Sequence, residues 1–292
     1  MEIKELHQLY LSTCLVDTDT RNIRKGSIFF ALKGDNFNGN IFAQQALENG
    51  ARFSIVDEEA YAKGEQIILV EDVLSTLQNL ANFHRKFLNI PVIGLTGSNG
   101  KTTTKELMYG VLKTSYKAKS TLGNLNNHIG VPLTLLSFGN DTEIGIVEMG
   151  ANHQKEIEFL SNIAEPDFGY ITNFGKAHIE GFGSIQGVIQ GKSELYKYIT
   201  KEKGTLFFNA DDPIQNKLLG NYPAKVGFSQ TKANFYTLKK IDANPYVALQ
   251  IAQTNITSKL IGAYNFTNIC AGALIGNFFD IPLKDIKQAI PV

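Results

Sequence analysis

The chain reads Thr96-Gly97-Ser98-Asn99-Gly100-Lys101-Thr102-Thr103 between an apolar run and a predicted helix. The apolar residues 91–96 predict a buried strand, and residues 101–113 predict the helix. The two glycines let the loop bend so that its N–H groups face phosphate oxygens at the helix N-terminus. In such a loop Lys101 reaches the β- and γ-phosphates, and the Thr102 hydroxyl holds Mg²⁺. The stretch therefore predicts a phosphate-binding loop.

This loop is a short variant of the usual nucleotide-binding pattern. The strict pattern has glycine at position 95, where this chain has Leu95, so the spacing is Gly97-x-x-Gly100-Lys101-Thr102. Asn216-Lys217 is followed by Leu218-Leu219, so the guanine-recognition box is absent and a GTPase switch is disfavoured. Asp167-Phe168-Gly169 matches the metal-binding tripeptide of kinases, but no His-Arg-Asp catalytic loop precedes it. The loop alone therefore indicates a nucleotide site without deciding its chemistry.

Outward from the loop, strand and helix patterns alternate. Residues 144–148, 168–173 and 205–209 are further buried-strand runs separated by helix-length segments. This alternation predicts an α/β fold with a P-loop-type, mostly parallel, doubly wound central domain.

The residues that precede the loop predict a second, smaller α/β domain. Strand-like runs at 27–32, 52–56 and 66–70 surround a helix at 42–49, and an amphipathic helix follows from residue 74 until Pro91 ends it. We therefore expect two domains, residues 1–88 and residues 89–292.

Composition narrows the class of protein. The 292 residues hold 28 Lys and Arg against 28 Asp and Glu, so the net charge of +0 provides no field to attract nucleic acid or an anionic membrane. Cys14 and Cys270 are too few for a disulfide framework or for a zinc site made of thiolates alone. The N-terminal residues lack the pattern of a signal peptide, and no apolar stretch approaches the ~20 residues of a membrane span. We expect a cytoplasmic protein without a nucleic-acid or membrane partner.

Several motifs together resemble the Mur ligases, the ATP-dependent amide-forming enzymes of peptidoglycan precursor synthesis. Residues 96–103 resemble the ATP loop of that family, and residues 123–134, 147–153 and 177–184 resemble three further family segments. Thr18-Asp19-Thr20-Arg21 and residues 30–34 resemble the family's uridine-nucleotide-binding domain. The resemblance covers nearly the whole chain. It implies a small uridine-nucleotide-binding domain at residues 1–88 and a central ATP-binding domain at residues 89–292.

The resemblance also implies a role for particular residues. It implies that Lys192 is carbamylated. A lysine amine that is kept neutral in a metal-rich pocket can react with CO₂ to give an anionic carbamate. The implied catalytic residues are Lys101, His178 and Lys192. The implied ligands of two Mg²⁺ ions are Thr102, Glu148, His178 and carbamylated Lys192. The implied ATP-binding residues are Gly97, Ser98, Asn99, Gly100, Lys101, Thr102, Thr103, Asn127, Asn209, Asp211, Asn265 and Asn268. The implied residues for the uridine substrate are Thr18, Asp19, Thr20, Arg21 and Lys33.

At three places the chain departs from the family pattern. Ser193 follows Lys192 where glycine is usual, and Tyr264 stands where histidine is common. Asn38-Gly39-Asn40 stands where relatives often have Asp-Gly-His. These departures affect the carbamate neighbourhood, the adenine contacts and the uridine contacts respectively.

The implied reaction is amide ligation. UDP-N-acetylmuramoyl-tripeptide and D-alanyl-D-alanine are the expected small-molecule substrates, ATP and Mg²⁺ the expected cofactors, and a monomer the expected state. Mur ligases have a third, C-terminal domain for the incoming amino compound, and we expect this chain to lack it and to be poorly active or inactive alone.

Two other functions remain open from the sequence. A related ligase, such as a folylpolyglutamate or cyanophycin synthetase, would share the ATP loop but would lack the uridine-type first domain. A nucleotide-binding module without catalytic activity would share the loop as well. Turnover of ATP with UDP-N-acetylmuramoyl-tripeptide would discriminate between these functions.

Overall fold

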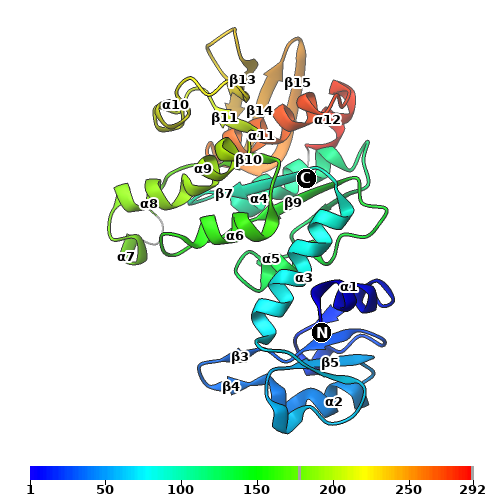
Figure 1. Cartoon of the computed structure of the whole chain (residues 1–292). Helices are drawn as coiled ribbons and strands as arrows, with labels where there is room; N and C mark the ends of the chain where they lie inside the picture. The colour runs from blue at the N-terminus through cyan, green and yellow to red at the C-terminus, as the bar shows by residue number, and fades with distance from the viewer. Residues whose placement is uncertain (177–178, 291–292) are drawn as a thin grey trace. The chain divides into compact units, whose positions relative to one another are not determined.

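The computed structural model describes residues 1–176 and 179–290 (Figure 1). The chain divides into two compact units. The first unit comprises Met1–Asn89 together with His128–Asn140, and the second comprises Ile90–Asn127 together with Asp141–Val292. The sequence did not predict that residues 128–140 pack with the first unit. In the described residues, no helix is both long and apolar enough to cross a membrane.

The first unit is built on a parallel sheet in the order β1-β2-β5-β6. Its buried core gathers Phe29 and Ala31 from the sheet region with Ala43 and Ala46 from α2. Its strands are β1 (Val16–Asp17), β2 (Ile28–Phe30), β3 (Lys33–Gly34), β4 (Phe37–Asn38), β5 (Phe53–Val56) and β6 (Ile67–Leu69). Its helices are α1 (Ile3–Leu11), α2 (Ala43–Glu48), α3 (Val73–Leu88) and α5 (Gly130–Leu135), with 3₁₀ turns at Thr20–Asn22, Gly39–Phe42 and Glu59–Tyr61.

Helix α3 begins and ends through local chemistry. The Asp72 side chain accepts a hydrogen bond from the Ser75 N–H at 2.6 Å, which satisfies one free N–H group of the first turn. The helix ends because Asn89 adopts the left-handed conformation, with φ 48°. The expectation that Pro91 ends this helix was therefore wrong by two residues.

Hydrogen bonds tie the segment 128–140 to α1 and α3. The Tyr10 hydroxyl donates to the Leu136 carbonyl at 2.6 Å, and the His84 Nε2 lies 2.8 Å from the Phe138 carbonyl oxygen. The His7 Nε2 lies 3.0 Å from the His84 Nδ1, inside the same buried cluster. Side chains of α1 and α3 thus satisfy carbonyl groups of a segment that is distant in sequence.

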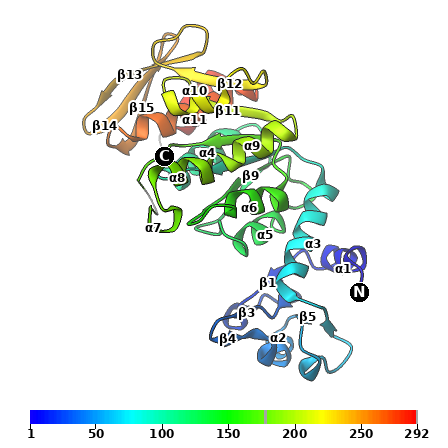
Figure 2. The ribbon, with the colours of Figure 1, turned by 60° about the vertical axis from the view of Figure 1, so that its left-hand side comes forward.

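The second unit contains a nine-stranded sheet in the order β15-β14-β13-β12-β11-β10-β7-β9-β8. Every pairing from β8 to β13 is parallel, whereas β13, β14 and β15 pair antiparallel at one edge (Figure 2). The strands are β7 (Val92–Thr96), β8 (Ala118–Ser120), β9 (Ile144–Glu148), β10 (Phe168–Ile171), β11 (Thr205–Asn209), β12 (Lys225–Ser229), β13 (Tyr236–Ala243), β14 (Tyr246–Ile251) and β15 (Thr254–Ile261). The α/β fold with a mostly parallel central sheet is therefore confirmed.

Helices cover both faces of this sheet. Gly169 faces Leu195 and Ile199 of α9, whereas its neighbour Tyr170 packs in the core with Leu274 of α11 on the opposite face. Helices α4 and α11 pack against each other on that second face, while α6 packs with α9 on the first. The helices are α4 (Lys101–Leu112), α6 (Glu156–Ala164), α7 (Ile179–Phe182), α8 (Ile185–Lys192), α9 (Glu194–Lys201), α10 (Pro213–Leu219), α11 (Asn265–Phe278) and α12 (Leu283–Ala289).

The strand order reverses at β7. The chain runs from β7 to β8 and β9 on one side, then crosses to β10, β11 and β12 on the other. Ligands of open α/β sheets bind where the order reverses, beyond the carboxyl ends of the strands. The end of β7 at Thr96, the end of β9 at Glu148 and the end of β10 at Ile171 are brought together at this point.

Candidate functional site

The loop between β7 and α4 requires glycine at two positions. Gly97 has φ +143°, and a Cβ there would lie 2.0 Å from the Thr172 Oγ1. Gly100 has φ +76°, and a Cβ there would lie 2.7 Å from the Asn268 Oδ1. Since the first-turn N–H groups of a helix have no intrahelical partner, the start of α4 offers donors and a positive dipole end to an anion. The geometry is that of a phosphate-binding loop.

Residues after β10 hold the loop in shape. Asn173 accepts the Ser98 N–H at its carbonyl oxygen at 3.1 Å and the Asn99 N–H at its Oδ1 at 3.2 Å. Its amide donates to the Asn99 carbonyl at 2.9 Å, and the Thr172 hydroxyl donates to the same carbonyl at 2.6 Å. Thr172 and Asn173 were not predicted as site residues, although their position directly after a buried strand is a signal that the sequence contains.

Lys101 begins α4 and folds back over the loop. Its ammonium donates to the Gly97 carbonyl at 2.9 Å and lies 3.4 Å from the Ser98 carbonyl oxygen. Burial lowers the pKa of Lys101, while the charge of Glu148 acts in the opposite direction. The ammonium is therefore positioned where phosphate oxygens would replace the loop carbonyls as partners.

Glu148 ends β9 with its side chain inside the protein, 1% exposed. Its Oε1 accepts a hydrogen bond from the Asn126 amide at 2.9 Å and lies 3.5 Å from the Thr102 hydroxyl. Its Oε2 is buried and has no hydrogen-bond partner in the part of the chain that the structure describes. A buried carboxylate oxygen without a partner carries a large desolvation cost, so this atom is suited to a cation.

The donor set at Glu148 fits Mg²⁺. Carboxylate and hydroxyl oxygens are the ligands that Mg²⁺ prefers, and the ion is usually held by one or two carboxylates together with phosphate oxygens and waters. Among residues 1–176 and 179–290, no group of three or more His, Cys, Asp and Glu side chains could hold a metal ion alone. A site at Glu148 and Thr102 would therefore depend on oxygens of a bound nucleotide.

Asn126 is a site residue that the sequence analysis missed. The sequence motif implied its neighbour Asn127, which is exposed, whereas Asn126 donates to Glu148. The Asn126 carbonyl also accepts the Gly150 N–H at 2.7 Å. The pair of adjacent asparagines was visible in the sequence, but only the loop conformation decides which amide meets the carboxylate.

Lys192 lies at the end of α8 and is 1% exposed. Its ammonium donates to the Ala151 carbonyl at 3.0 Å and lies 5.2 Å from the ring centroid of Phe182. Burial and then the charge of Lys101 lower the pKa of Lys192 to about 8. The expected site residue His178 lies outside the described residues.

Two further expected groups of site residues form internal networks. The Asp211 carboxylate accepts the Ser229 hydroxyl at 2.5 Å, and its N–H donates to the Asn209 Oδ1 at 2.9 Å. The Asn268 amide donates to the Asn265 Oδ1 at 2.9 Å, and the Asn268 Oδ1 accepts the Thr104 hydroxyl at 3.1 Å. Asn268 therefore connects α11 to the helix that follows the phosphate loop.

The first unit has a cavity of about 630 Å³ at the expected uridine residues. Phe37 and Phe42 stack there with ring centroids 5.6 Å apart and an interplanar angle of 15°. Arg21 donates to Asp19 at 2.6 Å, and this hydrogen bond lowers the pKa of Asp19 to about 2. The cavity is lined by Thr18, Asp19, Thr20, Arg21, Phe29, Phe37, Phe42 and Gln45.

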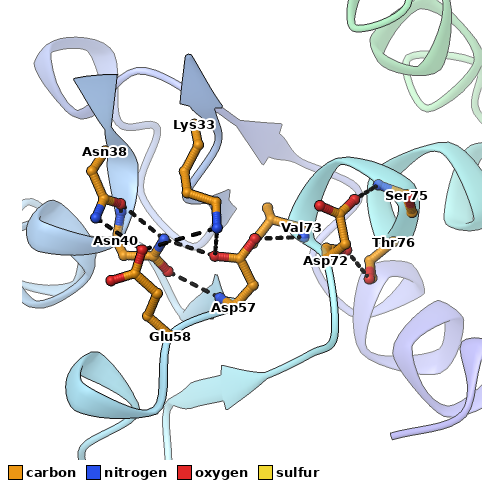
Figure 3. Close-up of polar contacts among 9 residues, drawn as sticks. All are labelled: Lys33, Asn38, Asn40, Asp57, Glu58, Asp72, Val73, Ser75 and Thr76. Carbon is orange, nitrogen blue, oxygen red and sulfur yellow. Dashed lines mark hydrogen bonds and ion pairs between the residues drawn. The ribbon is translucent and has the colours of Figure 1, made fainter. Parts of the chain in front are cut away.

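Lys33 is not among those lining residues, because it belongs to a neighbouring polar cluster (Figure 3). Its ammonium lies 3.0 Å from the Oδ1 of Asp57, whose side chain is only 2% exposed. Asp57 also accepts the Asn40 amide at 2.8 Å and the Val73 N–H at 3.2 Å. The hydrogen bond to Asp57 raises the pKa of Lys33. The cluster thus joins the β3–β4 hairpin to the start of α3.

Comparison with known proteins identifies relatives along the whole chain. A family model described as Mur ligase middle domain matches residues 95–276, and one described as Mur ligase family, catalytic domain matches residues 15–85. UDP-N-acetylmuramoyl-tripeptide–D-alanyl-D-alanine ligase of Bacillus subtilis is 35% identical over 289 residues, which cover 94% of this chain and 61% of the relative. The protein with the same name from Escherichia coli is 33% identical, with coverage of 98% and 65%. The chain thus spans about three fifths of the length of these curated relatives.

Solved structures give the same result. The crystal structure of MurF from Acinetobacter baumannii has a TM-score of 0.83 at 28% identity, over 97% of this chain and 67% of that one. MurF ligase from Thermotoga maritima, solved in complex with ADP, has a TM-score of 0.80 at 30% identity, over 95% and 66%. These matches confirm the resemblance that the sequence motifs indicated.

Proposed function

Because the chain belongs to the Mur ligase family, we propose that it acts in ATP-dependent ligation of D-alanyl-D-alanine to UDP-N-acetylmuramoyl-tripeptide. The observation that carries the proposal is the buried Glu148 carboxylate. Its Oε1 lies near the Thr102 hydroxyl of the phosphate loop, and its Oε2 has no hydrogen-bond partner among residues 1–176 and 179–290. The names of the relatives support the choice of substrates. That the protein is a cytoplasmic monomer without a membrane or nucleic-acid partner stays a prediction.

The proposed reaction has two steps. In the first, the terminal carboxylate of the tripeptide attacks the γ-phosphorus of ATP, which forms an acyl phosphate and releases ADP. In the second, the amine of D-alanyl-D-alanine attacks the acyl carbon, forms the amide bond and releases phosphate and a proton. Catalysis of phosphoryl transfer rests mainly on positioning and on charge neutralisation.

The residues of the phosphate loop supply both the positioning and the charge neutralisation. The N–H groups at the start of α4 bind phosphate oxygens, and Lys101 exchanges its loop carbonyls for the β- and γ-phosphates. Glu148 and Thr102 would hold Mg²⁺, which offsets phosphate charge and orients the reacting groups when bound. Asn126 orients the Glu148 carboxylate through its hydrogen bond to Oε1.

Lys192 is proposed to hold a second Mg²⁺ as a carbamate. A neutral amine is needed for this chemistry, since its nitrogen attacks CO₂ and releases one proton. The lowered pKa of about 8 increases the neutral fraction at physiological pH. His178, which lies outside the described residues, remains a proposed catalytic residue and Mg²⁺ ligand. Asn127, Asn209, Asp211, Asn265 and Asn268 remain proposed ATP-binding residues.

The cavity of the first unit is proposed to take the uridine nucleotide. Residues 18–21 line it, and the stacked rings of Phe37 and Phe42 offer a planar apolar surface. Lys33 remains a candidate contact because 44% of its side chain is exposed, although Asp57 binds its ammonium. The assignment of residues 1–88 to the uridine nucleotide and of residues 89–292 to ATP stays a prediction.

A turnover assay tests the proposal. ADP formation from Mg-ATP should require UDP-N-acetylmuramoyl-tripeptide, and mass spectrometry should detect the pentapeptide product only when D-alanyl-D-alanine is added. Tripeptides with diaminopimelate or lysine at the third position are compared in parallel. ADP formation stimulated by a folate and glutamate instead would indicate a different ligase, and nucleotide binding without any turnover would indicate a binding module.

A further inference from the structure

Lys105 is a buried lysine with no part in the function proposed above. It follows Lys101 by one helical turn on α4 and is 0% exposed. Its ammonium donates to the Thr121 carbonyl at 2.6 Å and lies 2.9 Å from the Oε1 of Glu106. Burial of an ammonium group costs free energy. A lysine at this buried position therefore suggests a role that an apolar side chain could not perform.

We propose that Lys105 and Thr121 are positioning residues that place the Glu148 carboxylate for the nucleotide-bound divalent cation. This inference rests on the proposed function. It assigns neither residue a contact with the substrate or the cation, because both act through Glu148.

Thr121 is the link between the lysine and the carboxylate. It follows the last residue of β8 and continues the parallel pairing with β9, since its N–H donates to the Ile146 carbonyl at 3.0 Å. Its hydroxyl accepts the Glu148 N–H at 2.9 Å. Thr121 is itself 0% exposed, so water does not compete for these bonds.

The chain of contacts therefore runs from the phosphate-loop helix to the end of β9. Lys105 holds the backbone of Thr121, and the Thr121 side chain holds the backbone of Glu148. Of the two carboxylate oxygens of Glu148, Oε1 accepts the Asn126 amide and lies 3.5 Å from the Thr102 hydroxyl, whereas Oε2 has no partner among the described residues. The location of that free oxygen thus depends on the Glu148 backbone, which Thr121 anchors.

Lys101 and Lys105 lie on successive turns of α4 and have different partners. Lys101 and Thr102 at the start of α4 contact the loop and Glu148, while Lys105 ties the next turn of the helix to the loop after β8. Movement of α4 relative to β9 would separate Thr102 from Glu148. The hydrogen bonds that Lys105 and Glu148 donate to Thr121 oppose that movement.

The test compares Thr121→Val with Thr121→Ser. Valine keeps the shape of the side chain but removes the hydroxyl that accepts the Glu148 N–H, and serine keeps it. ADP binding to the 292-residue chain is measured by isothermal titration without divalent cation and over a series of Mg²⁺ concentrations. For Thr121→Val we expect the Mg²⁺ concentration for half-maximal enhancement to rise by roughly 3- to 30-fold, with ADP affinity in the absence of Mg²⁺ unchanged. Thr121→Ser should remain close to the parent chain.

Lys105→Met tests the other end of the chain of contacts. It should shift the Mg²⁺ dependence in the same direction, and the double substitution with Thr121→Val should shift it by less than the product of the two single effects. Lys113→Met is the matched control, because Lys113 lies at the end of the same helix and is exposed. If Lys105→Met fails to fold, the valine and serine variants at residue 121 still decide the question.

Three outcomes are distinguishable. An unchanged Mg²⁺ dependence in folded Thr121→Val overturns the positioning role. Equal loss of ADP affinity with and without Mg²⁺ also overturns it, because that result indicates a purely structural role. If the parent chain itself shows no Mg²⁺-dependent ADP binding, the proposed nucleotide site fails first, and the inference falls with it.

Discussion

Lys101 is the charge that the phosphate loop offers to a nucleotide, and its present partners are loop carbonyls at 2.9 and 3.4 Å. We expect Lys101→Ala to weaken binding of Mg-ADP by roughly 10- to 100-fold, since hydrogen bonds to charged groups contribute more than neutral ones. The measurement is isothermal titration with circular dichroism to establish folding. Lys113→Ala, which removes an exposed lysine from the same helix, should retain the parent affinity. Equal affinities in all three proteins would show that the loop does not bind phosphate.

The proposed carbamate on Lys192 should form to an extent that depends on pH. Its pKa is lowered to about 8, so the neutral amine that reacts with CO₂ becomes more abundant as the pH rises through that value. Carbamate should therefore form on the chain with ¹³CO₂ and increase between neutral and mildly alkaline pH, as measured by ¹³C NMR. Lys192→Arg serves as the control because arginine cannot carry a carbamate. A carbamate signal that persists in this variant would contradict the assignment.

At the scale of elements, the contact of α1 and α3 with residues 128–140 contains a buried histidine pair. His84 Nε2 donates to the Phe138 carbonyl, so its Nδ1 accepts from His7 Nε2. The remaining His7 Nδ1 is buried and has no hydrogen-bond partner in the described part of the chain. Any added proton must enter this apolar surrounding, and burial together with His84 lowers the pKa of His7 to about 4. Burial also lowers the pKa of His84.

The free energy of unfolding should therefore fall in acid. Above pH 6.5 the ring is neutral in both states; as the pH falls from 6.5 toward 4, the unfolded chain binds the proton first. Because the pKa of His7 falls from 6.5 to about 4, we expect a loss of roughly 2–3 kcal/mol across this range from His7, measured by urea unfolding. His7→Phe combined with His84→Gln should flatten the dependence, whereas the control His153→Gln, at an exposed histidine, should not. An unchanged slope in the double variant would refute this origin.

At the scale of the molecule, the two compact units predict separate binding of the two nucleotides. UDP-N-acetylmuramoyl-tripeptide should slow amide hydrogen exchange around residues 18–21 and 37–42 in the first unit. Mg-ADP should slow exchange in residues 97–103 and around Glu148 in the second unit. Each ligand serves as the control for the other in exchange measured by mass spectrometry. Protection by the uridine nucleotide confined to the second unit would overturn the assignment of the first.

Ligation by residues 1–292 alone is a further test at this scale. Closure of a site over an acyl phosphate excludes water and completes the catalytic arrangement. The chain spans 61% of the length of the Bacillus subtilis relative. We expect this polypeptide to bind both nucleotides but to form product poorly. Product formation at a rate typical of an intact ligase, detected by mass spectrometry, would show that the acceptor site lies within these residues.

Much of the fold could be predicted from the sequence because its signals are local. Apolar runs predicted β7, β9, β10 and β11, and the spacing of glycines and Lys101 predicted a phosphate loop before α4. The strand-end position of Glu148 placed its carboxylate near that loop, because parallel strands end at the same edge of a sheet. Each inference needs only the period of the side chains or the chemistry of a few adjacent residues.

Other features depended on contacts between segments far apart in the chain. The sequence alone did not distinguish Asn126 from Asn127 as the partner of Glu148, nor did it place residues 128–140 in the first unit. In the sequence Lys105 is an ordinary helix residue, and only the structure shows that the Thr121 carbonyl accepts a hydrogen bond from it. Hydrogen bonds of this kind join atoms that only the folded backbone brings together. The local pattern of residues in the sequence therefore does not predict them. The sequence by itself determined which chemistry the chain carries, and the tertiary structure decided which side chains hold that chemistry in place.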